Sequence, residues 1–203
     1  MKIGVLALQG AVREHMNMII KAGEEPVAVK NRAGLEQVDA LILPGGESTA
    51  IGKLMSDFGL KDEIVRRAKE GMPVWGTCAG MILLAKHIVN QDSTHLNLMD
   101  IWVRRNAYGS QLDSFITHRA VPGVSENPIP LVFIRAPYVE KVGPEVKVLL
   151  EIDGKVVAAR QGNLLATAFH PELTEDLSFH RYFISMAAEN FKQMAAAVPE
   201  EPR

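Results

Sequence analysis

The first half of the chain alternates short apolar runs with segments in which apolar residues recur at helical spacing. The apolar runs are followed by turn residues and predict buried strands, whereas the periodic segments predict amphipathic helices. Strands and helices in regular alternation are typical of βαβ units, in which neighbouring strands run parallel. The predicted strands cover 3–8, 27–30 and 39–43, and the predicted helices cover 11–22, about 48–57 and 60–70.

The second half of the chain, beyond residue 98, changes to strands separated by turn residues. Asp153 and Gly154 stand between two of these strands and are typical of a two-residue hairpin turn. The stretch 121–130, which holds three prolines and a glycine, predicts a surface loop. A final helix is predicted from about 176 to 194, and 195–203 is expected to be a frayed tail. The predicted strands cover 101–104, 115–118, 131–134, 146–152, 156–160 and 164–169.

Composition narrows the class of protein. With 203 residues, of which 47% are hydrophobic, the chain can bury one core, so a single α/β domain over 1–203 is expected. A net charge of -2 and the lack of a basic run argue against a nucleic-acid ligand. The first apolar run is too short to span a membrane and is soon followed by Glu14. The single cysteine excludes an intrachain disulfide, and without a targeting segment the chain is expected in the cytoplasm.

The segment 73–84 has the pattern of a strand, a sharp turn and a helix, and it holds the only cysteine of the chain. Gly76 and Gly80 flank Cys78, which suits a strand-to-helix turn whose strained backbone leaves no room for neighbouring Cβ atoms. A thiol at the start of the following helix is favoured as the reactive thiolate by the helix dipole. A lone cysteine is also commonly a buried, inert residue, but the flanking glycines favour a nucleophile here.

A base and its orienting group are predicted at Phe169-His170-Pro171-Glu172, where the last predicted strand ends. Residues two apart in an extended chain project to the same side, so the Glu172 carboxylate is expected to orient the His170 imidazole. With Cys78, these residues form the nucleophile, base and orienter of a Cys-His-Glu triad. Taken alone, the same four residues are also compatible with a simple turn after a strand.

The stretch Pro44-Gly45-Gly46-Glu47-Ser48 follows another predicted strand. Consecutive glycines at the carboxyl end of a parallel strand can turn a backbone N–H into the crevice where such sheets bind ligands. Gly45 and Gly46 are therefore expected to form an oxyanion hole together with the N–H of Ala79. A Gly-Gly pair by itself is weak evidence, because most such pairs only make turns.

Motifs for nucleotides and metals are missing from the sequence. The glycine stretch lacks the spaced Gly-Lys-Ser/Thr of a phosphate-binding loop, and Lys53 lies too far into the following helix to replace it. The histidines lack metal-ligand spacing such as His-Glu-x-x-His, so no metal is predicted. They are His15, His87, His95, His118, His170 and His180.

Together, the stretches 44–48, 76–80 and 169–172 resemble the three signatures of class I, triad-type glutamine amidotransferases. Further stretches are similar to the glutaminase subunits of pyridoxal 5′-phosphate synthases, and the motifs together run from residue 6 to about 176. The resemblance implies a three-layer α/β fold with a mostly parallel, flavodoxin-like central sheet and helices on both faces. The further stretches are 8–15, 104–106, 133–137 and 170–174.

By this resemblance, the chain hydrolyses L-glutamine to L-glutamate and ammonia without a cofactor. Cys78 would attack the side-chain carboxamide, and His170 would carry a proton to the leaving ammonia. Water would then cleave the γ-glutamyl thioester. Glu172 would hold His170 in place.

The resemblance also implies how glutamine is held. The binding groups would be the loop Gly46-Glu47-Ser48, the side chain of Arg105 and the backbone around Ile134 and Arg135. A guanidinium suits this task because it binds a carboxylate with two parallel hydrogen bonds. An ordinary solvated charge at a strand end remains the alternative for Arg105.

A partner subunit is expected, because the chain offers no second site for an acceptor of ammonia. In the family, the acceptor is a β/α-barrel synthase that makes pyridoxal 5′-phosphate from ribose 5-phosphate, glyceraldehyde 3-phosphate and ammonia. The glutaminase is nearly silent until this synthase docks. The resemblance places Gln9, Arg13 and His15 toward the partner, and docking is expected to act through a peptide flip at Gly45-Gly46.

Three alternatives remain open from the sequence. A glutaminase of the same class could serve a different ammonia acceptor. A flavodoxin-like thiol hydrolase or chaperone would also carry a strained cysteine, but it would not need a His-Pro-Glu segment together with a Gly-Gly loop. A catalytically inactive regulatory subunit is the third, and the intact set of Cys78, His170 and Glu172 argues against it.

Overall fold

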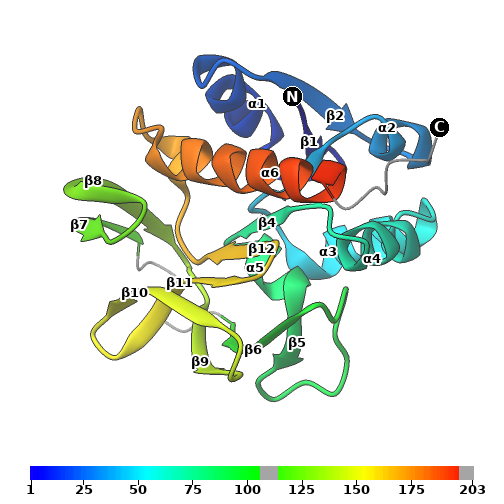
Figure 1. The fold of residues 1–203 in the computed structure, drawn as a ribbon. Helices are drawn as coiled ribbons and strands as arrows, with labels where there is room; N and C mark the ends of the chain where they lie inside the picture. Colours follow the sequence, from blue (N-terminus) through cyan, green and yellow to red (C-terminus); the bar gives the residue numbers. More distant parts are fainter. Residues whose placement is uncertain (106–113, 197–203) are drawn as a thin grey trace.

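The computed structural model describes residues 1–105 and 114–196, and a ten-stranded sheet organises this part of the chain (Figure 1). Five neighbouring strands at one end of the sheet are joined by parallel pairings, as the alternation of strands and helices predicts. In spatial order they are β2 (Glu25–Val29), β1 (Lys2–Leu6), β3 (Ala40–Leu43), β4 (Val74–Thr77) and β12 (Leu164–Thr167).

The other end of the sheet is mainly antiparallel. There β12 is followed by β11, β9, β6 and β5, and β10 pairs with β11 beside this path. Asp153 and Gly154 both have positive φ, as a two-residue hairpin between β10 and β11 requires, so the predicted turn is confirmed. These strands are β5 (Ala85–Ile88), β6 (Met99–Arg104), β9 (Tyr138–Val142), β10 (Lys147–Ile152) and β11 (Lys155–Gln161).

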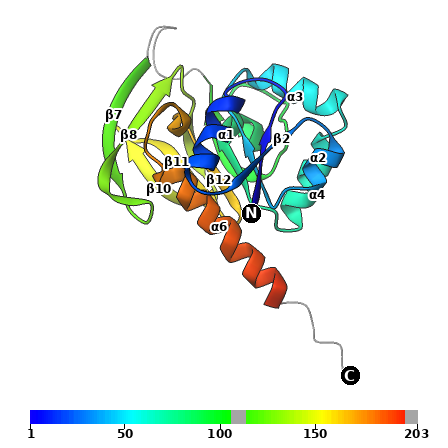
Figure 2. The same ribbon diagram turned by 90° about the horizontal axis from the view of Figure 1, so that it is seen from above.

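A separate two-stranded ribbon corrects the prediction of a surface loop at 121–130. In it β7 (Ser114–Val121) pairs with β8 (Ser125–Ile134), so most of the supposed loop is strand. Pro128 and Pro130 are compatible with this strand because residues two apart have the same orientation. The backbone nitrogens of both therefore point to the edge of β8 away from β7, where no N–H is needed. The ribbon lies on the opposite side of the molecule from α3 and α4 in Figures 1 and 2.

Helices cover both faces of the parallel strands, and the side chains of β4 show which helix lies on which face. Successive residues of a strand point to opposite faces. Trp75 packs against α1 and α6, with its ring centroid 5.7 Å from that of His15 and 5.5 Å from that of Phe183. Gly76 instead faces α5. The helices are α1 (Val12–Lys21), α2 (Arg32–Glu36), α3 (Ser48–Asp57), α4 (Lys61–Lys69), α5 (Ala79–Leu84) and α6 (Ser178–Ala196).

The predicted elements of the first half are confirmed with shifts of a few residues, whereas α2, β5 and β9 were not predicted. α2 is a single short turn with a glycine, Gly34, in its centre. β5 follows α5 directly, so no turn residue marks the boundary between them. The predicted tail 195–203 begins as the last two residues of α6, and its remainder lies outside the described residues.

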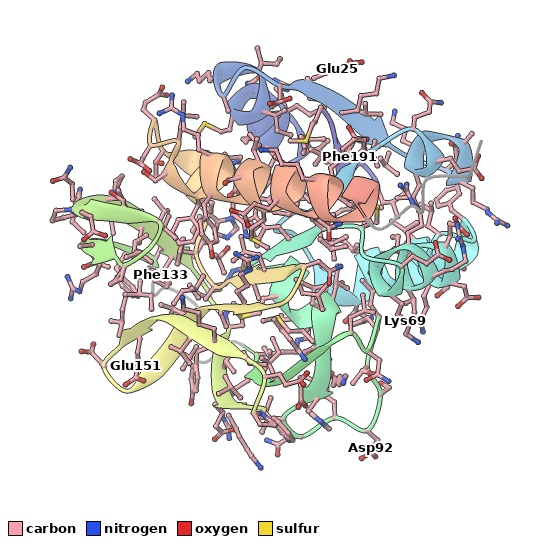
Figure 3. All side chains as sticks on the ribbon, viewed as in Figure 1. Glu25, Lys69, Asp92, Phe133, Glu151 and Phe191 are labelled. Carbon is pink, nitrogen blue, oxygen red and sulfur yellow. The ribbon has the colours of Figure 1, made fainter. Side chains whose placement is uncertain are left out.

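One hydrophobic core joins the sheet to its helices and to the ribbon. Phe133 of β8, labelled in Figure 3, is fully buried and stacks on Phe115 of β7 with ring centroids 4.6 Å apart. It also contacts Phe169 edge-on at 5.6 Å, so the ribbon is tied to the segment that follows β12. The end of α6 projects from the body in Figure 2, and Phe191 there is exposed.

None of the helices in the described residues is long and apolar enough to cross a membrane.

Candidate active site

Cys78 lies in a strained turn between β4 and α5, as the sequence pattern predicts. Its φ of 48° is positive, which is costly for a residue with a Cβ atom. The backbone is held in place by the Cys78 N–H, which donates to the Thr167 carbonyl on β12 at 2.8 Å. A Cβ atom on Gly76 would lie 2.3 Å from the Gly80 backbone, so strand and helix approach too closely there for a side chain. Cys78 as a whole is 8% exposed.

His170 and Glu172 form the predicted pair, although not through an extended chain. The Nδ1 atom of His170 lies 2.7 Å from Oε1 of Glu172. β12 ends at Thr167, and Glu172 belongs to the short 3-10 helix η1 (Pro171–Leu173). Pro171 favours this turn because its fixed φ suits the first position of a helix. The pairing was therefore predicted for the wrong geometric reason.

The candidate nucleophile and base open into a pocket of about 490 Å³ at the carboxyl ends of the parallel strands. Cys78 follows β4, His170 comes shortly after β12, and Gly45 follows β3. Such sheets bind ligands at this edge. Glu172 stands behind the imidazole and does not line the pocket. The lining residues are Gln9, Gly10, Ala11, Gly45, Gly46, Glu47, Ser48, Cys78, Ala79, Ile82, Arg105, Ile134, Arg135, Pro137, His170 and Leu173.

The charges of the site favour a protonated His170. Burial opposes the charged imidazole, but hydrogen bonds to Cys78 and Glu172 outweigh it and raise the pKa of His170 to about 10. Burial also opposes the charge on Glu172, yet the neighbouring His15 and His170 imidazoles hold the pKa of this carboxyl below its usual value. The site therefore combines an anionic carboxylate with an imidazolium that can stabilise a thiolate.

The glycine loop after β3 lies against the imidazole. A Cβ atom on Gly45 would be 2.4 Å from Cε1 of His170, so the loop can approach the ring only as glycine. The Gly45 carbonyl accepts a hydrogen bond from the Ala11 N–H at 3.0 Å. Ala79 begins α5 directly after Cys78. The structure thus brings the three residues predicted for the oxyanion hole, Gly45, Gly46 and Ala79, to the pocket that Cys78 lines.

Residues predicted to bind substrate line the same pocket. The Glu47 carboxylate caps α3 by accepting hydrogen bonds from the N–H groups of Thr49 and Ala50, at 3.0 and 2.5 Å. Its Oε1 lies 3.5 Å from Nη2 of Arg105. The hydroxyl of Ser48 is buried and has no hydrogen-bond partner among the described residues. A buried polar group of this kind is suited to receive a ligand.

The backbone at the end of β8 completes the pocket. The Ile134 carbonyl lies 4.0 Å from Sγ of Cys78. Arg135 follows with a φ of 44°, a left-handed conformation that bends the chain away from the strand. A strained residue beside a reactive group is a common feature of functional sites.

The residues predicted to face a partner divide into two groups. Gln9 and Arg13 are exposed, and Gln9 also accepts a hydrogen bond from the Glu47 N–H at 2.9 Å. His15 is completely buried, so the prediction that its side chain faces a partner is wrong. Helix α1 is amphipathic, and position 15 lies on its inner face with Met18 and Ile19.

Across 1–105 and 114–196, no three His, Cys, Asp or Glu side chains converge as a metal site would require.

Sequence reasoning missed several residues of the site. Gly10 and Leu173 were within recognised stretches, and their place in the lining could have been inferred from those motifs. His180 had no such signal, and the signature 76–80 gave no indication that the side chain of Thr77 contacts a histidine. The side chains of Thr77 and His180 meet His15 behind the triad, at 3.2 and 3.0 Å, because β4, α1 and α6 pack together.

A cysteine on a strand-to-helix turn, a His-Glu pair and a glycine loop at one edge of a parallel sheet define a triad-type glutamine amidotransferase. The chain belongs to the SNO glutamine amidotransferase family, whose profile matches residues 5–189. It is 59% identical over 187 residues to the pyridoxal 5′-phosphate synthase subunit PdxT of Caldanaerobacter subterraneus subsp. tengcongensis. That match covers 92% of this chain and 99% of the relative.

Two further relatives agree with this assignment. The PdxT subunit of Ruminiclostridium cellulolyticum is 59% identical over 186 residues, covering 91% of this chain and 98% of the relative. A solved crystal structure described as a glutamine amidotransferase superposes with a TM-score of 0.87 at 46% identity. It covers 92% of this chain and 98% of the solved chain.

Proposed function

We propose that this chain is the glutaminase subunit of a pyridoxal 5′-phosphate synthase. It hydrolyses L-glutamine to L-glutamate and ammonia and delivers the ammonia to a separate synthase subunit, in the cytosol. The observation that carries the proposal is the placement of Cys78, His170 and Glu172 around one pocket in a chain of this family. The PdxT relatives named above support the choice of acceptor.

The reaction begins at the thiol of Cys78. With His170 protonated, the thiolate attacks the carboxamide carbon of glutamine and forms a tetrahedral oxyanion. His170 gives its proton to the amide nitrogen, the C–N bond breaks, and ammonia leaves. The neutral imidazole then takes a proton from water as the water attacks the thioester, and glutamate departs as the thiolate is restored.

The oxyanion requires donors at fixed positions. The N–H of Ala79, at the start of α5, is one, and the Gly45-Gly46 loop supplies the other. The Gly45 carbonyl accepts from Ala11, so rotating this peptide breaks that bond. We infer that docking of the synthase controls the orientation of this peptide.

Substrate binding uses other residues of the same pocket. Arg105 binds the α-carboxylate of glutamine, Glu47 and Ser48 contact its polar groups, and the backbone at Ile134 and Arg135 borders the side chain. The buried, unpartnered hydroxyl of Ser48 supports this assignment. A charged guanidinium held near Glu47 supports it as well, because its position is fixed before substrate arrives.

The proposal is tested by glutamate release from L-glutamine. Three samples are compared: the chain alone, the chain with a pyridoxal 5′-phosphate synthase subunit, and Cys78→Ala with that subunit. Strong stimulation by the synthase that is lost in Cys78→Ala is the expected result. If the synthase does not change the activity, the proposed partner is wrong. If activity survives in Cys78→Ala, the proposed nucleophile is wrong.

A further inference from the structure

A buried polar network lies behind the triad, on the side away from the pocket. His15 of α1 is 0% exposed, and His180 of α6 is 1% exposed. Nδ1 of His15 lies 3.0 Å from Nε2 of His180. Nε2 of His15 lies 3.2 Å from Oγ1 of Thr77 and 3.4 Å from Oε2 of Glu172. A single imidazole therefore contacts both the triad carboxylate and the residue that precedes Cys78.

The proton positions in this network follow from the carboxylate. Ionised Glu172 can only accept, so Nε2 of His15 carries a hydrogen and Nδ1 of the same ring is an acceptor. His180 must then donate from Nε2, which leaves its Nδ1 as the bare nitrogen. That atom is buried and has no partner among the described residues. For two neutral rings, one arrangement of hydrogens thus fits every contact.

The second oxygen of Glu172 needs such a donor. Oε1 is occupied by His170 at 2.7 Å, whereas Oε2 is buried and has no well-aligned hydrogen bond within the described residues. Nε2 of His15 is hydrogen-bonded to Oγ1 of Thr77 at 3.2 Å and lies 3.4 Å from Oε2, so a small rotation of the ring or of the carboxylate is enough to bring its N–H to this oxygen. A buried carboxylate oxygen without any donor costs free energy and lets the carboxylate rotate or become protonated.

We propose that His15 is a positioning residue of the active site, which holds the second carboxylate oxygen of Glu172 through its neutral imidazole, with His180 fixing its tautomer. His15 touches no substrate atom and acts through Glu172. It keeps Oε1 directed at His170 and keeps the carboxylate ionised. The inference uses the proposed glutaminase reaction for one of its readouts and is independent of it for the other.

The charges around His15 agree with a neutral ring. Burial lowers its pKa, Glu172 and Glu14 oppose this effect, and His170 adds to it. Burial holds the pKa of His180 well below its usual value, and His15 lowers it further. Trp75 and Thr77, which also contact the ring, carry no charge.

The test compares two substitutions of His15 that differ in one donor. His15→Gln retains an amide N–H near the position of Nε2 and an oxygen that can accept from His180. His15→Met keeps a comparable volume but has no donor. In His15→Met, Glu172 is protonated at higher pH. The acid limb of the pH profile of kcat for glutamate release, measured with the synthase present, therefore moves to higher pH. At neutral pH we expect kcat to fall about tenfold with KM little changed, and His15→Gln to stay near the wild type.

The second readout is alkylation of Cys78 by iodoacetamide in the free chain, followed by mass spectrometry. Because the chain has one cysteine, the label reports this site alone. Below neutral pH, alkylation slows in His15→Met and not in His15→Gln. Ile19→Val, a packing change on the same buried face of α1, is the matched control and should lower the melting temperature without moving either pH profile.

A loss of thermal stability in His15→Met with unchanged pH profiles would overturn the proposal and leave His15 a packing residue. If His15→Met does not fold, His15→Asn replaces it, because its shorter side chain puts the amide near Nδ1 and not near Nε2. Absence of glutamate release from the wild type would count against the proposed function only. The alkylation profiles would still decide the role of His15.

Discussion

The carboxylate of Glu47 and the guanidinium of Arg105 meet in the lining of the active-site pocket, with Oε1 and Nη2 3.5 Å apart. Glu47 is itself fixed as the cap of α3, so Arg105 is held at a defined place although 27% of its side chain is exposed. The neighbouring Arg104 points elsewhere and binds both oxygens of Glu140, at 2.9 and 3.1 Å. The two adjacent arginines therefore differ in role.

Arg105→Met is expected to weaken substrate binding. Loss of a charged hydrogen bond to the substrate carboxylate costs about 1.5 to 3 kcal/mol, which raises KM about 10- to 100-fold with a smaller effect on kcat. Steady-state kinetics of glutamate release measure this. Arg104→Met is the matched control and should stay within about twofold of the wild type, because an exposed ion pair contributes little. Equal effects of the two substitutions would contradict the assignment of Arg105.

The strained backbone at Cys78 predicts that glycine is more stable than alanine at this position, the reverse of the usual order. Cys78→Gly and Cys78→Ala both remove the thiol, but only glycine adopts a φ of 48° without cost. Glycine is therefore expected to be the more stable by about 1 kcal/mol in the free energy of unfolding, measured by denaturant titration. At the exposed helical site Ala33, the substitution Ala33→Gly should instead destabilise by a similar amount. An alanine at position 78 as stable as glycine would show that the turn stores no strain.

Gly45→Ala is expected to displace the base without removing the nucleophile. The added Cβ would lie 2.4 Å from Cε1 of His170, so the ring or the loop must shift. Because a misplacement of about 1 Å can cost about 100-fold, kcat should fall by that order while Cys78 remains open to alkylation. Gly34→Ala in α2, whose nearest neighbour would be at 3.6 Å, should leave kcat unchanged. Normal turnover in Gly45→Ala would mean that the loop is free to move aside.

The pH dependence of stability follows from His170. Its pKa is raised from 6.5 in the unfolded chain to about 10 in the fold, so the stabilising contribution is complete below pH 6.5 and is lost as the pH rises toward 10. NMR titration of the His170 ring measures the folded value directly. Cys78→Ala removes one of the hydrogen bonds responsible, so its ring should titrate at lower pH, and the loss of stability, which still begins near pH 6.5, should be smaller and end at lower pH. Identical titrations in the two proteins would exclude the thiol as a cause of the shift.

Local patterns in the sequence determined the parallel half of the sheet and the turn at Cys78. A buried strand, a glycine at each side of the nucleophile and a following apolar helix depend on steric limits within a few residues. The same holds for the Asp153-Gly154 hairpin. The stretch 121–130 was misread as a loop because prolines are tolerated at an open strand edge, and the sequence does not show where edges lie.

Tertiary packing decided what lies behind the triad. His15 was predicted at a partner surface from its motif, yet the amphipathic face of α1 places it inside. Its contacts with Thr77 and His180 join residues 62 and 165 positions apart, and no short-range periodicity records such distances. The contact of His170 with Glu172 likewise depends on a 3-10 turn after β12. The sequence by itself determined which residues carry the chemistry, whereas the packing of α1 and α6 against β4 decided which groups support them, because burial is set by the whole fold.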